Sequence, residues 1–471
     1  MIASLHARRS IMLTLTAVGA SVTLPAAAQV AGAGTTADQQ AGPAPLSEPR
    51  RTGAPGALTR SSLRLPGVEN DFADLAIPVD PSADALRGQT VLARSRPNYD
   101  PVGINAGGFR ILPQISLRTG YLSNVFRQTG GAGDVYGQVR GAVLAASNWS
   151  RHQALFEGFV DQRVYSRYST ENGLTYSVRG AGRLDITDRA SISAGVQQGH
   201  NLVDRGATTE LLVTRRPVRY DYTAADVGLR VQQGRFAFDL TGLASHSAFE
   251  DAETPAGLPL NQSLRDATSY RVQGEVGYAS GAGPSLFVSV AADVRRFDDN
   301  VLRNRNSSGL EVLGGLRGDI TPLIRGRVGI GYFRYDFADP AISARSGMGV
   351  DARVDYLITP LTTISMTARR ELKNVSSINL PAALSTSFAA GVDHELLRNL
   401  VVSTGATFEN ADYVDSPLLV RRYGGHLGAF YLVNRRFRLD GDIAYRRRDG
   451  NSINTQQFGE VNASVGVTYR M

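Results

Sequence analysis

Histidine is the residue type in this sequence that most readily binds metals or transfers protons. The chain contains six histidines and no cysteine. No two of the histidines show the spacing of metal ligands, and the thiolates that would complete a structural zinc site are missing. The sequence therefore predicts no metal site and no cofactor. The six histidines are His6, His152, His200, His246, His394 and His426.

Hydrolytic chemistry has no motif in this chain. Neither a Gly-x-Ser-x-Gly elbow nor a His-Glu-x-x-His pair is present. A hydrolase would depend on Ser, His and Asp side chains that meet only in the folded chain, as they do in some barrel-borne outer-membrane proteases and phospholipases. We expect a protein that is not an enzyme, and a surface hydrolase is the least favoured hypothesis.

Charged side chains are better candidates, because many alternate with uncharged ones. Between residues 174 and 186 the even positions are uncharged, whereas the odd positions include Arg179, Arg183 and Asp185. Charges facing a barrel lumen can form rings that filter ions or polar solutes. Alternatively, opposite charges on neighbouring strands pair across the wall, and both interpretations require a hydrated interior. The candidate pore-lining residues are Glu157, Asp161, Arg163, Arg179, Arg183, Arg271, Glu275, Arg317, Arg353, Asp355, Arg438, Asp440 and Asp442.

The elements that must position these charges are strands. From Phe109 to the C-terminus the pattern has a period of two, which is typical of strands with one apolar face. Each uncharged row runs for about nine to eleven residues, the length of a tilted membrane-spanning strand. Strands of a soluble β-sandwich, the alternative fold, are usually about five or six residues long. An open edge in lipid would leave backbone groups unpaired, so we expect a closed barrel.

Short and long connections alternate between the rows. Eight tight turns and nine longer loops predict about 18 strands, with 16 as the lower bound and both chain ends on the tight-turn side. We therefore predict an all-β fold, a transmembrane antiparallel up-and-down barrel with a mostly disordered N-terminal extension. A barrel of this size is wide enough for an aqueous channel unless a loop or plug closes it. The segment 250–265 is the leading candidate for an infolded constriction.

The N-terminus indicates secretion. His6, Arg8 and Arg9 precede an apolar stretch at 11–22 and a small-residue cleavage site at 26–28. About twelve apolar residues fall short of the roughly 20 that a spanning helix needs, so residues 1–28 are predicted to be a cleaved signal peptide. Residues 29–95 are predicted to be a flexible periplasmic extension with a short helix near 83–94 or a plug, and residues 96–471 to be the barrel.

A family resemblance covers residues 94–126. This stretch contains Arg-Pro-Asn-Tyr-Asp-Pro-Val-Gly-Ile, followed by Ser-Asn-Val-Phe. It resembles the opening of the family named putative β-barrel porin 2, although Leu122 and Ser123 stand where that family has acidic residues. The resemblance implies an outer-membrane barrel, linked in many members with capsule or exopolysaccharide export. We expect the motif to fix the first strand rather than bind a ligand. Its matching residues are Arg96, Pro97, Tyr99, Asp100, Pro101, Gly103, Ile104, Gly108, Phe109, Pro113, Tyr121, Asn124, Val125 and Phe126.

These observations predict a porin-like protein of the Gram-negative outer membrane. Passive or partner-gated passage of polar solutes or polysaccharide through the lumen is the first hypothesis, and a sealed structural or adhesive barrel is the second. The expected partners are outer-membrane lipid, the barrel-assembly machinery and, by the resemblance, polysaccharide-export components. The last row alternates up to Met471, like the terminal signal that the assembly machinery reads. A formal net charge of +7 is a small excess for this length, so we expect no nucleic-acid partner.

Overall fold

The computed structural model describes residues 89–471, apart from 280, 282, 302, 378 and 453–454. The predicted signal peptide at 1–28 and most of the predicted extension at 29–95 lie outside the described residues. Of the helix predicted near 83–94, only residues 89–94 are described, and they form a turn in which Ala93 N donates to Thr90 O. No helix among the described residues is long and apolar enough to cross a membrane.

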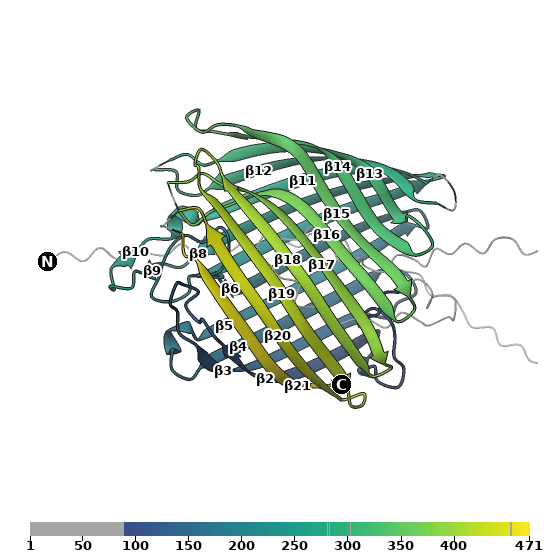
Figure 1. The fold of residues 1–471 in the computed structure, drawn as a ribbon. Helices are drawn as coiled ribbons and strands as arrows, with labels where there is room; N and C mark the ends of the chain where they lie inside the picture. The colour runs from purple at the N-terminus through teal and green to yellow at the C-terminus, as the bar shows by residue number, and fades with distance from the viewer. Residues whose placement is uncertain (1–88, 280, 282, 302, 378, 453–454) are drawn as a thin grey trace, which may run out of the picture. The chain divides into compact units, whose positions relative to one another are not determined.

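Eighteen strands of 12 to 15 residues form the wall of a barrel (Figure 1). Among the described residues, three shorter strands and two 3-10 turns complete the elements. The wall strands are β2 Phe109–Leu122, β3 Asp134–Ser147, β4 Gln153–Tyr165, β5 Gly173–Thr187, β6 Ala190–Leu202, β7 Arg219–Gln233, β8 Phe236–Phe249, β11 Ala267–Ala279, β12 Ser285–Phe297, β13 Ser307–Asp319, β14 Ile324–Phe337, β15 Arg345–Thr359, β16 Thr362–Lys373, β17 Ala383–Leu397, β18 Leu400–Tyr413, β19 Leu419–Leu432, β20 Phe437–Gly450 and β21 Phe458–Arg470. The others are β1 Ile104–Ala106, β9 Ala252–Glu253, β10 Pro259–Leu260, η3 Ser169–Glu171 and η4 Ser263–Arg265.

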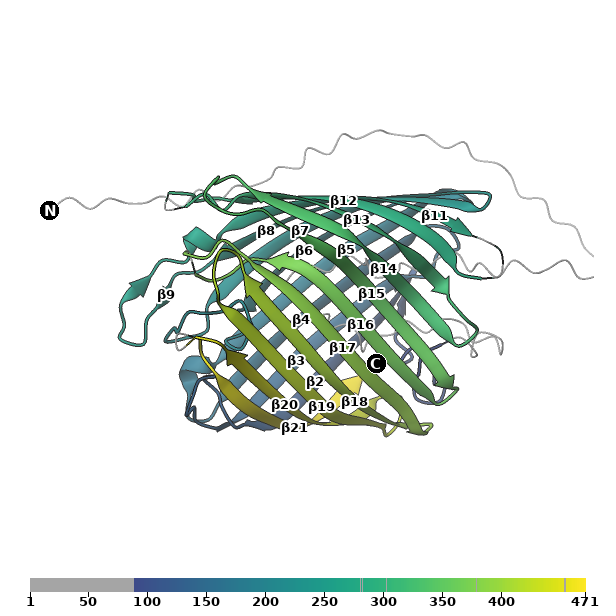
Figure 2. The ribbon, with the colours of Figure 1, turned by 45° about the horizontal axis from the view of Figure 1, so that its top comes forward.

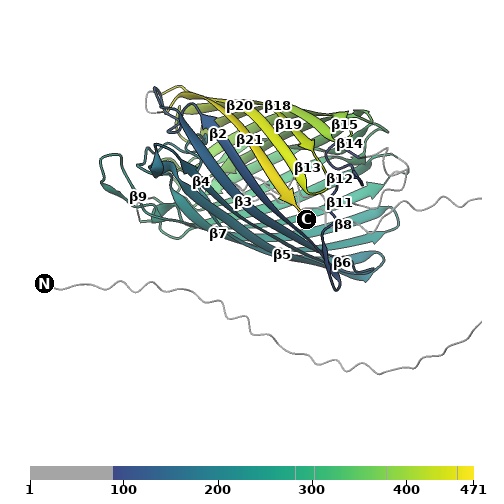
Figure 3. The ribbon, with the colours of Figure 1, turned by 90° about the horizontal axis from the view of Figure 1, so that it is seen from below.

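Every wall strand pairs antiparallel with its neighbours in the chain, and β21 returns to pair with β2 (Figure 3). The closing register runs from Gln114 opposite Arg470 to Leu122 opposite Asn462. The first residues of β2, which β21 does not reach, pair with β1 instead. The predicted closed barrel of about 18 antiparallel strands is therefore confirmed.

The two faces of the wall differ as the period-two pattern predicts. On the outside, large apolar side chains stand more than half exposed, among them Val178 at 60%, Leu184 at 60% and Val465 at 61%. A soluble protein rarely exposes so continuous an apolar surface, whereas lipid accepts it. The strands are tilted in the wall, which lets each one cross an apolar layer with its full length (Figure 2).

The barrel has a turn end and a loop end. The turn end carries eight short connections, at 148–152, 188–189, 234–235, 280–284, 320–323, 360–361, 398–399 and 433–436. The loop end carries nine connections, of which all but 414–418 are longer than any at the turn end: 123–133, 166–172, 203–218, 250–266, 298–306, 338–344, 374–382, 414–418 and 451–457. The start of β2 and the end of β21 both lie at the turn end, so the predicted alternation of eight turns and nine loops is seen.

Candidate functional site

The inner face of the wall carries the charged rows. Directly opposed residues of an antiparallel pair lie on the same face. The register opposes Glu157 to Arg179, Arg317 to Arg327, and Arg327 to Arg353. Extended around the barrel, this register places all 13 predicted residues on the face opposite the exposed apolar rows. They come from β4, β5, β11, β13, β15 and β20 and do not converge on one ring.

Most of these charges form ion pairs with charged side chains of the wall, some of them within the predicted set and others outside it. Glu275 binds both Arg317 and Arg327, the latter at 2.5 Å. Arg271 binds Asp293 and Glu311, each at 2.9 Å. Arg179 binds Asp226 at 3.0 Å, Arg183 binds Asp185 at 2.9 Å, and Arg438 binds Asp440. Ion pairing of the kind that the sequence offered as the alternative to an ion filter joins neighbouring strands at Arg271 and Asp293, whereas Arg183 and Arg438 pair within their own strands.

A few predicted residues make other contacts. The guanidinium of Arg163 lies over the ring of Tyr136, 4.7 Å from its centroid. Asp355 accepts a hydrogen bond from Ser365 at 2.6 Å. Within the described residues, no group of three His, Asp or Glu side chains is arranged to hold a metal ion. The chemistry available to this face is therefore recognition by charge and hydrogen bonding.

A loop from the opposite wall crosses the loop end of the lumen. Residues 203–218 connect β6 to β7, yet they bind β18, β19 and β20, which lie half-way around the barrel in strand order. Asp204 Oδ2 is 2.9 Å from Arg446 and 3.3 Å from Arg422, and Thr208 Oγ1 donates to Glu409 at 2.9 Å. We call residues 203–218 the crossing loop.

The segment 250–265, expected to fold inward, has a different arrangement. Its residues form the β9–β10 hairpin, which projects from the loop end (Figures 1 and 3). A hairpin satisfies its own backbone groups and needs no partner in the lumen. The segment reaches the crossing loop at two places, where the Arg215 amide donates to Glu253 O at 2.8 Å and where Arg265 binds Glu210 at 3.2 Å. The expectation that this segment constricts the lumen was therefore wrong, because the crossing loop takes that place.

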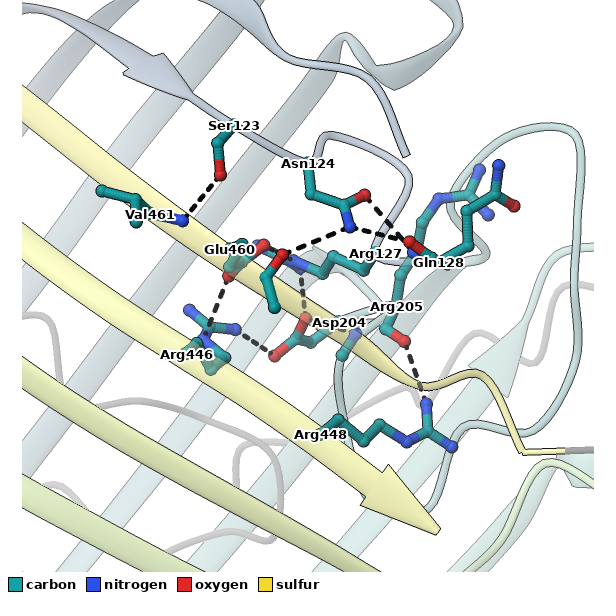
Figure 4. Close-up of polar contacts among 12 residues, drawn as sticks. Ser123, Asn124, Arg127, Gln128, Asp204, Arg205, Arg446, Arg448, Glu460 and Val461 are labelled. Carbon is teal, nitrogen blue, oxygen red and sulfur yellow. Dashed lines mark hydrogen bonds and ion pairs between the residues drawn. The ribbon is translucent and has the colours of Figure 1, made fainter. Parts of the chain in front are cut away.

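Asp204 is the centre of the crossing loop's attachment (Figure 4). Both of its carboxylate oxygens are used, since Oδ1 binds Arg127 while Oδ2 faces Arg422 and Arg446. The three arginines come from the β2–β3 loop, β19 and β20. Burial alone would raise the pKa of Asp204, but Arg127, Arg446 and Arg422 outweigh it and hold this pKa well below its usual range. The carboxylate is therefore ionised at neutral pH.

Wall carboxylates hold the same arginines in place. Glu460 binds Arg127 at 2.9 Å and Arg446 at 3.2 Å, and Glu409 binds Arg422 at 2.9 Å. Burial would lower the pKa of Arg127, but Asp204 and Glu460 raise it above its usual value. Because their side chains are fixed from behind, the three guanidinium groups form a preorganised cradle around Asp204. We call Arg127, Arg422 and Arg446 the arginine cradle.

The next residue of the crossing loop anchors it on the other side. Arg205 forms two hydrogen bonds of 2.8 Å to Glu171 in η3. The backbone carbonyl of Arg205 accepts a hydrogen bond from Arg448 at 3.3 Å. Arg448 is fully buried at 0% exposed, and its Nε and Nη2 have no hydrogen-bond partner among the described residues.

The far part of the crossing loop rests on an apolar patch. Leu211 packs against Val375, Ala411, Tyr413 and Val420. The hydroxyl of Tyr413 donates to the Thr208 carbonyl, and the amide of Leu211 donates to Ser376 Oγ at 2.8 Å. The crossing loop is thus held by charge at its start and by packing further on.

A second attachment closes part of the turn end. Arg96, the first residue of the family motif, binds Glu395 at 3.0 Å, and Arg94 binds the same carboxylate at 3.2 Å. Val91 is fully buried, and its amide donates to Thr363 Oγ1 at 3.0 Å. Burial lowers the pKa of Arg96 although Glu395 opposes this. Val91, Arg94 and Arg96 therefore attach the chain to β16 and β17. We call residues 89–103 the docked segment.

The rest of the family motif makes local contacts at both ends. Asp100 accepts hydrogen bonds of 2.6 Å from the Ser95 hydroxyl and the Arg96 amide. Two arginines at the turn end of the wall bind the backbone of the docked segment: Arg435 donates to Pro97 O and Arg470 donates to Tyr99 O. Arg110 donates to Pro101 O at 2.8 Å, and Asn124 donates to Gln128 O at 2.8 Å. The ring of Phe126 packs edge-on against Tyr168, with the ring centroids 4.8 Å apart. Gly103 has a positive φ of +76°, which glycine adopts without strain.

Sequence reasoning missed Asp204, Glu395 and the arginine cradle. Arg422 could have been found, because it lies in an inner row of β19 with Gly424 and His426 that follows the same period of two. Asp204 lies in a loop, where no periodicity marks an inward residue.

The fold and the lumen together define a porin-like barrel, with an apolar skin, a charged interior and loops gathered at one end. The family described as "Putative beta-barrel porin 2" matches residues 96–471, and the chain belongs to this family. It is thus a porin-like barrel of the outer membrane.

Solved structures of low similarity have also been found. The siderophore receptor PirA from Pseudomonas aeruginosa shares 8% identity, with 79% of this chain and 81% of that chain covered and a TM-score of 0.39. OccAB4 from Acinetobacter baumannii shares 9% identity over 80% of this chain and 100% of that chain, with a TM-score of 0.39. The outer membrane protein OpdK from Pseudomonas aeruginosa shares 10% identity over 77% and 98%, with a TM-score of 0.38. No curated protein matches the chain.

Proposed function

We propose that this barrel lets polar solutes or polysaccharide pass through its lumen, passively or gated by a partner, without catalysis. The observation that carries the proposal is the separation of the two wall faces. Uncharged rows cover the outside, while paired charges such as Arg271 with Asp293 cover the inside. Charges of this kind need water, so the interior is a polar path through an apolar layer.

Orientation follows from the connections. Outer-membrane barrels place their tight turns in the periplasm and their longer loops outside. The crossing loop is then the constriction at the outer mouth, and the docked segment lies at the periplasmic mouth. Polysaccharide-export components, if they are the partners, would meet the barrel at the docked segment.

A sealed barrel is the second candidate, and the tied loop end favours it. The crossing loop binds the opposite wall, and other loops bind one another. Arg303 binds Asp339 at 3.5 Å, and the Ser343 amide donates to Asp415 at 2.8 Å. A lumen closed by these contacts would serve a structural or adhesive protein.

Conductance across planar bilayers distinguishes the two functions. The wild-type barrel should carry ionic current, and its liposomes should swell in small sugars faster than in large ones. A variant with residues 206–214 replaced by a short Gly-Ser linker should carry more current, because the crossing loop narrows the mouth. If neither protein conducts and no sugar enters, the sealed barrel is correct and passage through the lumen is excluded.

A further inference from the structure

The position of Asp204 is that of a bound ligand. Its carboxylate lies among three arginines that come from three separate elements, and none of these elements is a chain neighbour of the crossing loop. Paired guanidinium groups are the preferred protein partners of a carboxylate. The crossing loop therefore inserts its own carboxylate into a site built on the far wall.

This site is accessible to solvent. The side chain of Asp204 is 35% exposed, and those of Arg422 and Arg446 are 31% and 36% exposed, whereas Arg127 at the back of the site is 18% exposed. Ion pairs with this much exposure contribute little stability and exchange readily with competing ions. A solute that reaches the mouth can thus approach the arginine cradle without unfolding the wall.

Withdrawal of Asp204 would leave an excess of positive charge. Arg127 and Arg446 would share the single carboxylate of Glu460, and Arg422 would keep Glu409. Arg448, opposite Arg422 in the register, would lose its cover and add a further cation. The vacated site then attracts an anion, because unscreened like charges in a partly desolvated pocket repel one another.

The bound position of the crossing loop also has an energetic cost, which favours replacement of Asp204 by a competing ligand. It buries Arg448 completely while two of its guanidinium nitrogens lack partners among the described residues. A buried guanidinium without a full set of acceptors is unfavourable relative to a hydrated one. Release of the crossing loop would let water or ligand oxygens satisfy Arg448.

We propose that Arg127, Arg422 and Arg446 form a binding site for a carboxylate-bearing solute, and that Asp204 occupies this site as an internal competitor. The inference rests on the proposed passage of polar solutes and names the substrate class as acidic. Entry of an acidic saccharide would displace Asp204 and free the start of the crossing loop. A neutral saccharide of the same size would find no such partner.

Calorimetric titration of the detergent-solubilised full chain tests this directly. The probe is trigalacturonate, with maltotriose as the neutral control of equal ring number. Trigalacturonate should bind and maltotriose should not. Asp204→Asn should tighten trigalacturonate binding about tenfold, because the site no longer spends most of its time occupied by the chain's own carboxylate. Arg446→Gln and Arg422→Gln should each weaken it about tenfold.

Controls separate this inference from the proposed function. Asp319→Asn removes an exposed carboxylate that pairs with Arg325 at the turn end, away from the crossing loop, and it should leave binding unchanged. Heat-modifiable gel migration confirms that each variant is a folded barrel. Equal binding of both saccharides, or unchanged affinity in Asp204→Asn, would overturn the carboxylate site. Absence of bilayer current with binding intact would overturn passage through the lumen and leave the site established.

Discussion

The two mouths of the barrel are covered in different ways. At the turn end, one deeply buried carboxylate, Glu395 at 7% exposed, holds the two arginines of the docked segment. At the loop end, several charges share the attachment of the crossing loop: Asp204 is partly exposed among three arginines, and Arg205 forms a buried pair with Glu171. The first attachment is dry and concentrated, whereas the second is distributed and is wet around Asp204.

This difference has consequences for how each cover can move. A buried ion pair is strongly destabilising to break singly, because the remaining charge stays in a medium that solvates it poorly. Exposed pairs are weak one by one and are screened by salt. The docked segment should therefore release in one step or not at all, whereas the start of the crossing loop should respond gradually to ions, acid and ligands.

Loss of the buried carboxylate should give the largest effect. Glu395→Ala removes the carboxylate that binds Arg94 and Arg96, and it should weaken the docking free energy of the docked segment by about 3–5 kcal/mol. The docked segment should then detach while the wall stays intact. Amide hydrogen exchange at Val91, whose amide donates to Thr363 in the wild type, should become fast. Trypsin should also cleave after Arg94, which is followed by Ser95.

An exposed ion pair at the same end provides the control. Asp319 binds Arg325 at 2.8 Å, with side chains 62% and 48% exposed. Asp319→Ala should change stability by about 0–1 kcal/mol and leave Val91 protected. If Glu395→Ala behaved like this control, the contrast between a dry and a wet cover would be lost.

Acid should loosen the loop end, with an intermediate effect. The pKa of Asp204 is lowered in the folded protein, so its stabilising contribution is complete above the unfolded pKa of about 3.9 and is lost as the pH falls through the lower folded value. Hydrogen exchange of the crossing loop should be flat from about pH 8 to 5 apart from its intrinsic pH dependence. Below about pH 4 the exchange rate of the crossing-loop amides should increase beyond its intrinsic pH dependence. The charged groups that face Asp204 are Arg127, Arg422 and Arg446, with Glu460 and Glu409 behind them.

The Asp204→Asn variant sharpens the acid experiment. Its crossing loop should already exchange quickly at neutral pH, and acid should add little. A wild-type loop that loosened between about pH 8 and 5 would contradict the lowered pKa of Asp204, because that carboxylate should remain charged throughout this range.

The wall was predictable because its signal is local. A residue's parity within a strand fixes its face, and the register that closes β2 onto β21 carries the same parity around the barrel. This is why Arg179 and Glu275, read from separate rows, both lie on the inner face. The alternation of short turns and longer loops then predicted the number of strands and their up-and-down order, and no tertiary contact was needed for this.

The covers of the two mouths were not predictable, because their partners are far apart in sequence. Both 203–218 and 250–265 are long loops of equal length, so length could not tell them apart. The outcome depended on whether a loop could satisfy its own groups, as the β9–β10 hairpin does, or needed partners such as Arg446 on the far wall. Likewise, no feature of the sequence around Arg96 predicts its ion pair with Glu395.

The smallest effect should come from the apolar footing of the crossing loop. Tyr413 is fully buried, and its hydroxyl donates to the Thr208 carbonyl. Tyr413→Phe keeps the ring and leaves that carbonyl unpaired, at a cost of about 1 kcal/mol. Exchange of the Leu211 amide, which donates to Ser376, should accelerate about fivefold, since ~1.4 kcal/mol corresponds to a factor of ten. The Val91 amide at the turn end should not change, because the two covers share no residue. Equal acceleration at Val91 would mean that the mouths open together and that the wall between them is a coupled element.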